Sequence, residues 1–197
     1  MGSLLGIGLR SDAAGGGISA ALVERVDLVC HPDSPSDAVT RIMVEIERSD
    51  RLRLCFRLTG RAADVVFPSV GEAIRADGLW QTTCFEAFVK PAGGACYREY
   101  NFAPSRCWAA YWFDGYRSGM AEIASVPPLN ITSEFTEAGY ELRVELPLDR
   151  ACALGLSAVI EEVGGVKSYW ALVHPPGKPD FHHGDCFALQ VAAPEAA

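Results

Sequence analysis

The chain has 197 residues, of which 49% are hydrophobic and 21% are charged, and its formal net charge is −8 at pH 7. This length and composition predict one domain with a sizeable core. The acidic balance and the lack of any cluster of Lys and Arg argue against nucleic acid and anionic membrane surfaces as partners, because both need concentrated positive charge.

The N-terminal segment does not resemble an export signal. Arg10 and Asp12 interrupt the weakly apolar stretch Leu4–Leu9, a glycine run follows, and no apolar run reaches the about 18 residues of a membrane span. We therefore expect a cytoplasmic protein with a flexible tail over 1–17, one folded domain over 18–193 and a flexible end over 194–197. The seven cysteines include no C-x-x-C pair, which favours buried free thiols over disulfides or a zinc site.

Alternation of apolar and polar residues dominates the chain and predicts strands. The expected strands are 22–30, 42–47, 51–58, 84–90, 97–102, 107–113, 129–135, 140–146, 157–163, 168–173 and 186–191. Turn signals stand between several of them, for example Pro91–Gly94, and the only helix expected is one or two turns over Leu148–Leu154. Short strands at this spacing predict an all-β fold, an antiparallel β-sandwich of jelly-roll type with at most one or two short helices.

The segment 77–120 mixes aromatic and polar side chains within three neighbouring strands. Aromatic rings can stack on the C–H groups of a sugar, while carboxylate, amide and guanidinium groups bind its hydroxyls. Alternation places Glu86 on one face of its strand, and Glu99 with Asn101 on one face of the next, so the turn between the strands lets these side chains meet. We predict a non-catalytic binding site for a carbohydrate or a similar polar ring, formed by Trp80, Glu86, Glu99, Asn101, Trp108, Trp112 and Arg117.

The same residues allow other functions. The aromatic side chains fit equally well in a sandwich core, which would leave a structural or interaction module. Glu86 and Glu99 could serve as the acid and base of a glycosidase, which would need a carboxyl separation of roughly 5–9 Å. Met120 with His174 could hold haem b as axial ligands. The oligomeric state is left open.

A second polar region, Ser168–Cys186, contains three of the four histidines. Its weak candidates for metal ligands are His174, His182, His183 and Asp185, but their spacing matches no known metal motif. A turn in which Asp180 and His182 bond backbone groups is the favoured interpretation. The chain also lacks the phosphate-binding, dinucleotide-binding and serine-hydrolase motifs, so no catalytic residue and no metal site are predicted.

Three stretches resemble a known superfamily: LWQTTCFEAFV, YREYNFAPSRCWAAYWFDGYRSGM and SYWALVHPPGKPDFHHGDCFAL. They are similar to the DOMON-like proteins related to family-nine carbohydrate-binding modules, and most similar to an uncharacterised bacterial subgroup labelled MurB-like. The resemblance covers roughly Leu28 to Val191. It implies a β-sandwich that binds a sugar or a haem-like ligand in a concave site, with tryptophans clamping a terminal sugar. The positions here that could play such parts are Trp80, Glu86, Asn101, Trp108 and Arg117.

Overall fold

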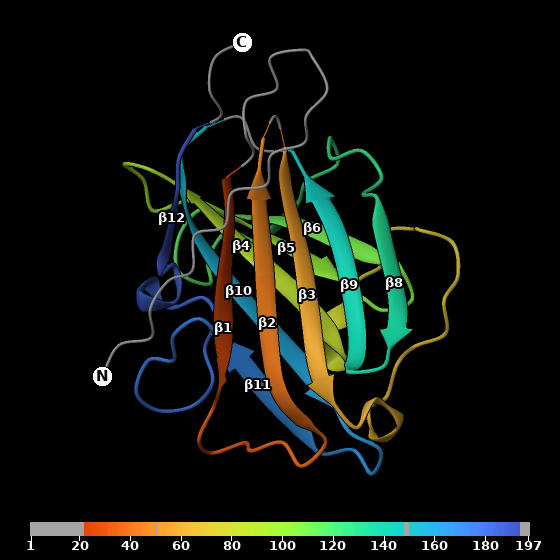
Figure 1. The fold of residues 1–197 in the computed structure, drawn as a ribbon. Coiled ribbons are helices and arrows are strands. Elements are labelled where there is room, and N and C mark those ends of the chain that lie inside the picture. The colour runs from red at the N-terminus through yellow and green to blue at the C-terminus, as the bar shows by residue number, and fades with distance from the viewer. Residues whose placement is uncertain (1–21, 50, 148–149, 194–197) are drawn as a thin grey trace.

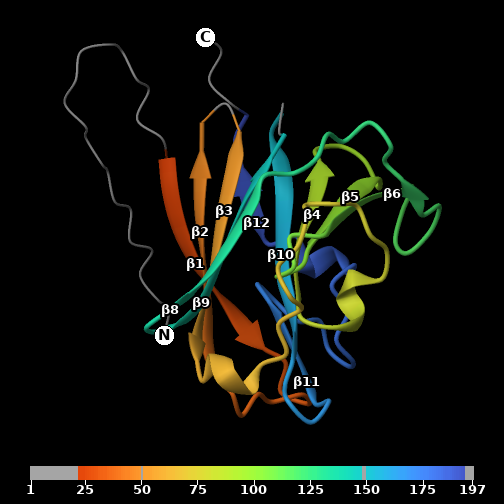
Figure 2. The same ribbon diagram turned by 90° about the vertical axis from the view of Figure 1, so that its right-hand side faces the viewer.

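The computed structural model describes residues 22–49, 51–147 and 150–193, and antiparallel strands dominate them (Figure 1). The strands of these residues form one hydrogen-bonded network that curls into two facing layers, which Figure 2 shows edge-on. The predicted all-β antiparallel sandwich is confirmed. The predicted tails 1–17 and 194–197, and the predicted domain start at residue 18, lie outside the described residues.

The first layer contains five strands in the order β1-β2-β3-β9-β8. Their bounds are β1 Leu22–Cys30, β2 Val39–Arg48, β3 Leu52–Gly60, β9 Gly139–Leu146 and β8 Ile131–Thr136. The strand β1 joins the layers, because Leu28 pairs with β2 whereas Val29 and Cys30 pair with β11 of the second layer.

The second layer runs in the order β7-β6-β5-β4-β10-β11, and β12 pairs with the start of β10. Its strands are β4 Cys84–Pro91, β5 Tyr97–Phe102, β6 Trp108–Phe113, β7 Ala121–Glu122, β10 Cys152–Glu161, β11 Lys167–Ala171 and β12 Leu189–Val191. Three short 3-10 helices complete the described elements: η1 Ala62–Asp64, η2 Leu79–Gln81 and η3 Gly184–Cys186.

The core fills the space between the two layers. Alternate residues of β2 and β3, such as Ile42, Val44 and Phe56, are fully buried against Phe85 and Phe102 of the second layer. Burying each such side chain stabilises the fold by roughly 1.5–3 kcal/mol. Both layers therefore follow the period of two that the sequence predicts.

The outer face of the first layer is a grid of Arg and Glu side chains. Arg57 pairs with Glu141, Arg53 with Glu145, and Arg143 also contacts Glu141. Most of these side chains remain partly exposed, so each pair contributes only about 0–1 kcal/mol. This face of the layer is therefore charged, in contrast to the face that packs in the core.

The helix expected over Leu148–Leu154 is wrong where the structure describes it. Residues 148–149 lie outside the described ranges, and Cys152, Ala153 and Leu154 form the start of β10. These three residues pair with β4 on one side and with β12 on the other. The ladder bonds from two partners outweigh the weak local signal of Pro147 and Gly155, which the sequence could not reveal.

Loops cover part of the outer face of the second layer. The segment that leads into η3 packs directly on β10, where Gly155 makes this possible: a Cβ atom there would lie 3.0 Å from the carbonyl oxygen of Cys186. The predicted strand over 186–191 is correspondingly shorter, because Cys186 belongs to η3. No helix in the described part of the chain is long and apolar enough to cross a membrane.

Candidate ligand-binding site

A cavity of about 390 Å³ lies on the outer face of the second layer. It is lined by Trp80, Glu86, Phe88, Glu99, Phe113, Arg117, Met120, Val159, Tyr169, Pro179, Phe181 and His182. The lining is apolar and aromatic with a few polar groups, which is the usual composition of a small-molecule site. Its volume also falls in the usual range of roughly 300–1,000 Å³.

The floor of the cavity comes from β4, β5 and β10. Glu86 pairs across the ladder with Asn101 on one side and with Ser157 on the other, and Glu99 pairs with Phe88. These side chains share one face of the sheet, because directly paired residues point the same way. Two carboxyl groups, 3% and 5% exposed at Glu86 and Glu99, therefore lie side by side under an aromatic cavity.

Each carboxyl group has one hydrogen bond from a buried neighbour. Ser157 Oγ donates to Glu86 Oε2 at 2.8 Å, and Asn101 Nδ2 donates to Glu99 Oε1 at 2.8 Å. The hydrogen bond from Ser157 uses Oε2 of Glu86, and the Glu86 side chain lines the cavity. The carboxyl group is therefore placed where a ligand can bond it.

Burial raises the pKa of Glu86 to about 8, and repulsion from Glu99 adds to the effect, while Ser157 and Arg117 oppose it. Burial also raises the pKa of Glu99, against the hydrogen bond from Asn101 and the charge of Arg117. Two carboxylates this close and this buried cannot both ionise easily. At neutral pH the pair consequently holds a proton.

His182 approaches this pair in its neutral form. Tyr97 Oη accepts a hydrogen bond from the backbone N–H of Arg117 at 3.3 Å and lies 2.7 Å from His182 Nδ1. Burial, assisted by the charge of Arg117 and opposed by that of Asp180, lowers the pKa of His182 to about 4. In the tautomer with the hydrogen on Nε2, the Tyr97 hydroxyl donates to Nδ1 and Nε2 faces Glu99 Oε2 at 3.7 Å.

The rim of the cavity is closed by an ion pair between two loops. Arg117 donates from Nε and Nη2 to Asp180 Oδ1 at 3.2 and 2.8 Å, and Tyr116 Oη donates to Asp180 Oδ2 at 2.6 Å. Burial alone would raise the pKa of Asp180, but these hydrogen bonds and the Arg117 charge lower it. Arg117 also has φ +49°, a strained conformation for this residue. The hydrogen bonds of Arg117 with Asp180 and Tyr97 stabilise this conformation and keep the side chain at the rim.

Trp80 supplies the aromatic edge of the cavity. It lies in η2, which begins after Gly78 at φ +71°, and its ring meets Tyr111 edge-on with centroids 6.1 Å apart. Tyr111 Oη in turn donates to Asp77 at 2.6 Å, which ties the segment to β6. Trp80 is 39% exposed, so one part of the indole is free for a ligand.

The structure brings together four of the seven predicted site residues: Trp80, Glu86, Glu99 and Arg117 all line the cavity. Asn101 lies beneath them, fully buried. Trp108 and Trp112 do not join them, since they pair with Phe102 and Arg98 on the opposite face of the sheet. Trp108 is a core residue, 3% exposed with the Arg75 guanidinium 4.4 Å above its ring. The sequence placed both tryptophans in the site because alternation cannot say which face is the core.

The predicted haem and metal ligands are spread over several places. Met120 lines the cavity, whereas His174 lies outside it and bonds the carbonyl oxygen of Val29 at 2.8 Å through Nε2. His183 and Asp185 form their own contact at 3.5 Å on the surface. In the described ranges no three His, Cys, Asp or Glu side chains lie close enough to hold a metal ion. As expected for a turn, Asp180 accepts from the backbone N–H of His182.

Sequence analysis missed several residues of the site. Ser157 and Val159 reach it from β10, and Tyr169 from β11, through pairings of strands far apart in the chain. Phe181 and His182 come from the loop before η3. The cluster of His and Asp residues in that loop was noticed as a possible metal site, but no local pattern signals that it packs over β4 and β5.

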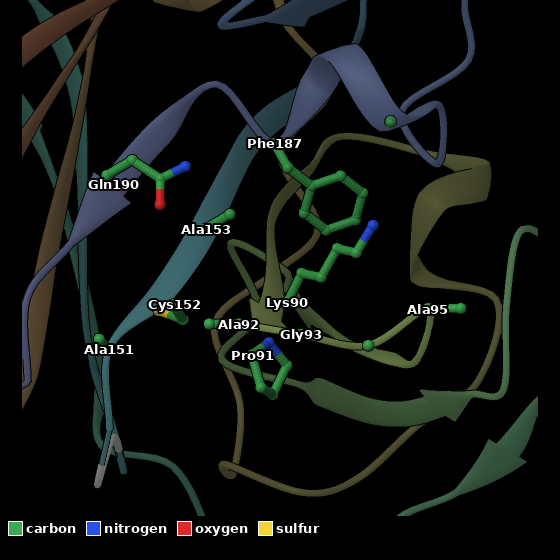
Figure 3. A pocket seen from close by; sticks show the side chains of 12 residues that line it. Lys90, Pro91, Ala92, Gly93, Ala95, Ala151, Cys152, Ala153, Phe187 and Gln190 are labelled. Carbon is green, nitrogen blue, oxygen red and sulfur yellow. The ribbon is translucent and has the colours of Figure 1, made fainter.

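A second hollow lies beyond the other side of η3, at the turn between β4 and β5 (Figure 3). It is larger, about 540 Å³, but its wall consists mainly of backbone and small side chains. Lys90 extends along Phe187 there, with Nζ 5.5 Å from the ring centroid. The described residues that line it include no Asp or Glu, so it offers a ligand fewer polar contacts than the first cavity.

No protein-family model and no curated protein matches the chain. A solved structure from Bacteroides uniformis ATCC 8492, described as a "putative carbohydrate-binding protein", is similar, with a TM-score of 0.61 over 84% of each chain at 13% identity. At this identity the likeness shows a shared fold. The resemblance to DOMON-like proteins stays a prediction; what this comparison establishes is a fold in common with that protein.

Proposed function

We propose that the cavity binds a single sugar ring, or a polar ring of similar size, without catalysing a reaction. The observation that carries this proposal is the pair of buried carboxyl groups of Glu86 and Glu99 under an otherwise aromatic cavity. Hydroxyl groups of a sugar donate hydrogen bonds that such acceptors need, and the ring C–H groups suit the exposed part of Trp80. The description of the structural neighbour as carbohydrate-binding supports the same ligand class.

The ligand class is the one predicted from the sequence, but the residues that would contact the ligand differ from the predicted ones. A clamp of two tryptophans is not available, because only Trp80 lines the cavity. Tyr169 and Phe181, whose centroids are 6.2 Å apart, and Phe113 supply the remaining aromatic surface. The polar contacts come from the floor and the rim, that is, from Glu86, Glu99 and Arg117.

A thermal-shift screen of monosaccharides and disaccharides, followed by calorimetric titration of any sugar that raises the melting temperature, tests the proposal. Glu99→Gln and Trp80→Ala should each weaken the binding of that sugar at least about tenfold. Glu99→Gln removes a hydrogen bond to a charged group, and Trp80→Ala removes a stacking surface. Glu134→Gln is the matched control, since Glu134 pairs with Arg143 on the first layer. Unchanged affinity in both site variants would place the ligand elsewhere.

A second candidate function is glycoside hydrolysis in the same cavity. It is favoured by one observation: Glu86, with its pKa raised to about 8, is protonated at neutral pH as a general acid must be. Hydrolysis needs two carboxyl groups that flank the scissile bond, and Glu86 and Glu99, diagonal neighbours on one sheet face, are the pair that would have to do so. Hydrolysis of disaccharides or alkyl glycosides, whose leaving groups need a proton from a general acid, would establish the enzyme instead if Glu86→Gln abolished it.

A further inference from the structure

The charges around the cavity do not balance. Among the residues that the structure describes, Arg117 is the only Lys or Arg that lines it, and its Nε and Nη2 already bond Asp180. Burial lowers the pKa of His182 to about 4, so its ring is neutral near pH 7. Tyr97 and Tyr169 add only hydroxyl groups. Among the described residues that line the cavity, the one cation whose charge reaches Glu86 and Glu99 is therefore Arg117 at the rim, and it is already paired with Asp180.

Buried carboxylates without a partner are costly, and proteins respond by pairing them or by protonating them. Here the free protein protonates the pair. A ligand that brings its own positive charge would remove the need for that proton. The surrounding rings favour the same ligand, because a cation is attracted to the faces of Trp, Tyr and Phe within about 6 Å. The net charge of −8 also draws cations toward the molecule.

We propose that the ligand of this cavity is an amino sugar, whose protonated amine lies between the carboxyl groups of Glu86 and Glu99 while its ring contacts Trp80. This inference rests on the proposed sugar-binding function and narrows it to one chemical class. The two carboxyl groups are diagonal neighbours across a ladder, with Cα atoms about 7–8 Å apart, a spacing that long side chains bridge. An ammonium group has three hydrogens and can donate to Oε1 of Glu86 and Oε2 of Glu99 together.

The amine also suits the oxygens that the two acids offer. Ser157 bonds Oε2 of Glu86 and Asn101 bonds Oε1 of Glu99. We therefore assign the other oxygen of each acid to the ligand, Oε1 of Glu86 and Oε2 of Glu99, the latter 3.7 Å from His182 Nε2. A neutral hydroxyl would satisfy one of these oxygens. An ammonium group satisfies both and compensates their charge, so the charge-assisted bonds are the stronger ones.

Calorimetric titration of the full-length protein with matched sugars tests the inference. The panel contains glucosamine, galactosamine and mannosamine, each beside its N-acetyl and its hydroxyl counterpart. We expect each bound amino sugar to exceed both counterparts by at least about tenfold in affinity, because charge-assisted hydrogen bonds are roughly twice as strong as neutral ones. Glu86→Gln and Glu99→Gln should reduce this preference, and Glu134→Gln should leave it unchanged.

Proton release gives a second readout that does not depend on affinity. Titrations near pH 7 in buffers of different ionisation enthalpy should show up to about one proton released for each amino sugar bound, because the ammonium displaces the proton shared by the pair. A neutral sugar should release none. In Glu86→Gln the release should fall. An amino sugar that binds without proton release would contradict the placement of the amine.

The outcomes separate the two proposals. If a neutral sugar binds as tightly as its amino counterpart, sugar binding is supported and the inference of an amino sugar is wrong. If an acyclic amine such as N-methylglucamine binds as tightly as the amino sugars, the cation site is supported and recognition of a sugar ring is wrong. If no member of the panel binds at millimolar concentration, both proposals fail.

Discussion

Glu86 and Glu99 lie diagonally across the β4–β5 ladder on one face of the sheet, because Glu86 pairs with Asn101 and Glu99 pairs with Phe88. Both are almost fully buried, and each has one buried hydrogen-bond donor, Ser157 for Glu86 and Asn101 for Glu99. The two carboxyl groups thus occupy buried strand positions at which Val or Ile is more common. The arrangement costs stability at high pH and provides acceptors for a ligand.

The pKa of Glu86 predicts how stability depends on pH. It is raised from 4.5 in the unfolded chain to about 8 in the fold, so between these values the folded state holds a proton that the unfolded chain has lost. The stabilisation that the fold gains from this proton is therefore fully present below about pH 4.5 and is lost as the pH rises through about 8. Relative to Glu86→Gln, the wild type should lose on the order of a few kcal/mol of unfolding free energy between pH 5 and 9.

Urea unfolding of both proteins at several pH values measures this loss. Gln keeps an acceptor for the Ser157 hydroxyl, so the comparison isolates the ionisation. Two unfolding free energies that change in parallel with pH would show that Glu86 has an ordinary pKa in the fold.

The effect of His182 on stability depends on pH in the opposite direction. Burial and Arg117 lower its pKa from 6.5 to about 4, so the unfolded chain binds a proton that the fold excludes, and stability falls as the pH drops from about 6.5 toward 4. Nitrogen-15 NMR should show a neutral ring at pH 5.5 with the hydrogen on Nε2. His182→Asn should flatten the acid limb of the stability profile. A ring already charged at pH 5.5 would refute the neutral pairing with Tyr97.

Two tryptophans should respond differently to replacement. Trp108 is buried in the core between the layers, so Trp108→Ala should destabilise the protein by about 3–5 kcal/mol, the usual cost of deleting a large buried ring. Trp80 is 39% exposed beside the cavity, so Trp80→Ala should cost about 1 kcal/mol or less in stability while weakening the ligand. Chemical denaturation with a binding titration of each variant measures both. Equal losses of stability would mean that Trp80 belongs to the core.

The Arg117–Asp180 pair should hold the rim loops rather than the fold. Its side chains are 52% and 18% exposed, so Asp180→Asn should cost only about 0.2–1 kcal/mol of stability. Freed from Asp180, the loop with Tyr116 and Arg117 should exchange its backbone hydrogens faster, and ligand affinity should fall severalfold. Hydrogen exchange of residues 114–119 measures this, with Glu134→Gln as the control for loss of an exposed pair. Unchanged exchange would show that other contacts hold the rim.

The sequence determined most of the fold, because the strand period of two is a local property of the chain. Ile42, Val44 and Ile46 alternate with polar residues and lie in the core, and β1 and β5 have the predicted bounds. The turn Pro91–Gly94 also joins β4 and β5 in the register that brings Glu86 opposite Asn101. The start of β10 was not predicted, because its strand character comes from partners far away in the chain.

The site was determined only in part by the sequence. Alternation grouped Glu86 with its neighbours and Trp108 with Trp112, but it is symmetric and cannot tell the core face from the outer face. That choice was made by the tertiary structure, which buries Phe85, Tyr100 and Trp108 against the first layer and leaves the acids on the other side. The loop with Asp180 and His182 then closes over those acids through Arg117 and Tyr97. These contacts join residues more than 60 positions apart, and only the packing of whole layers brings them together.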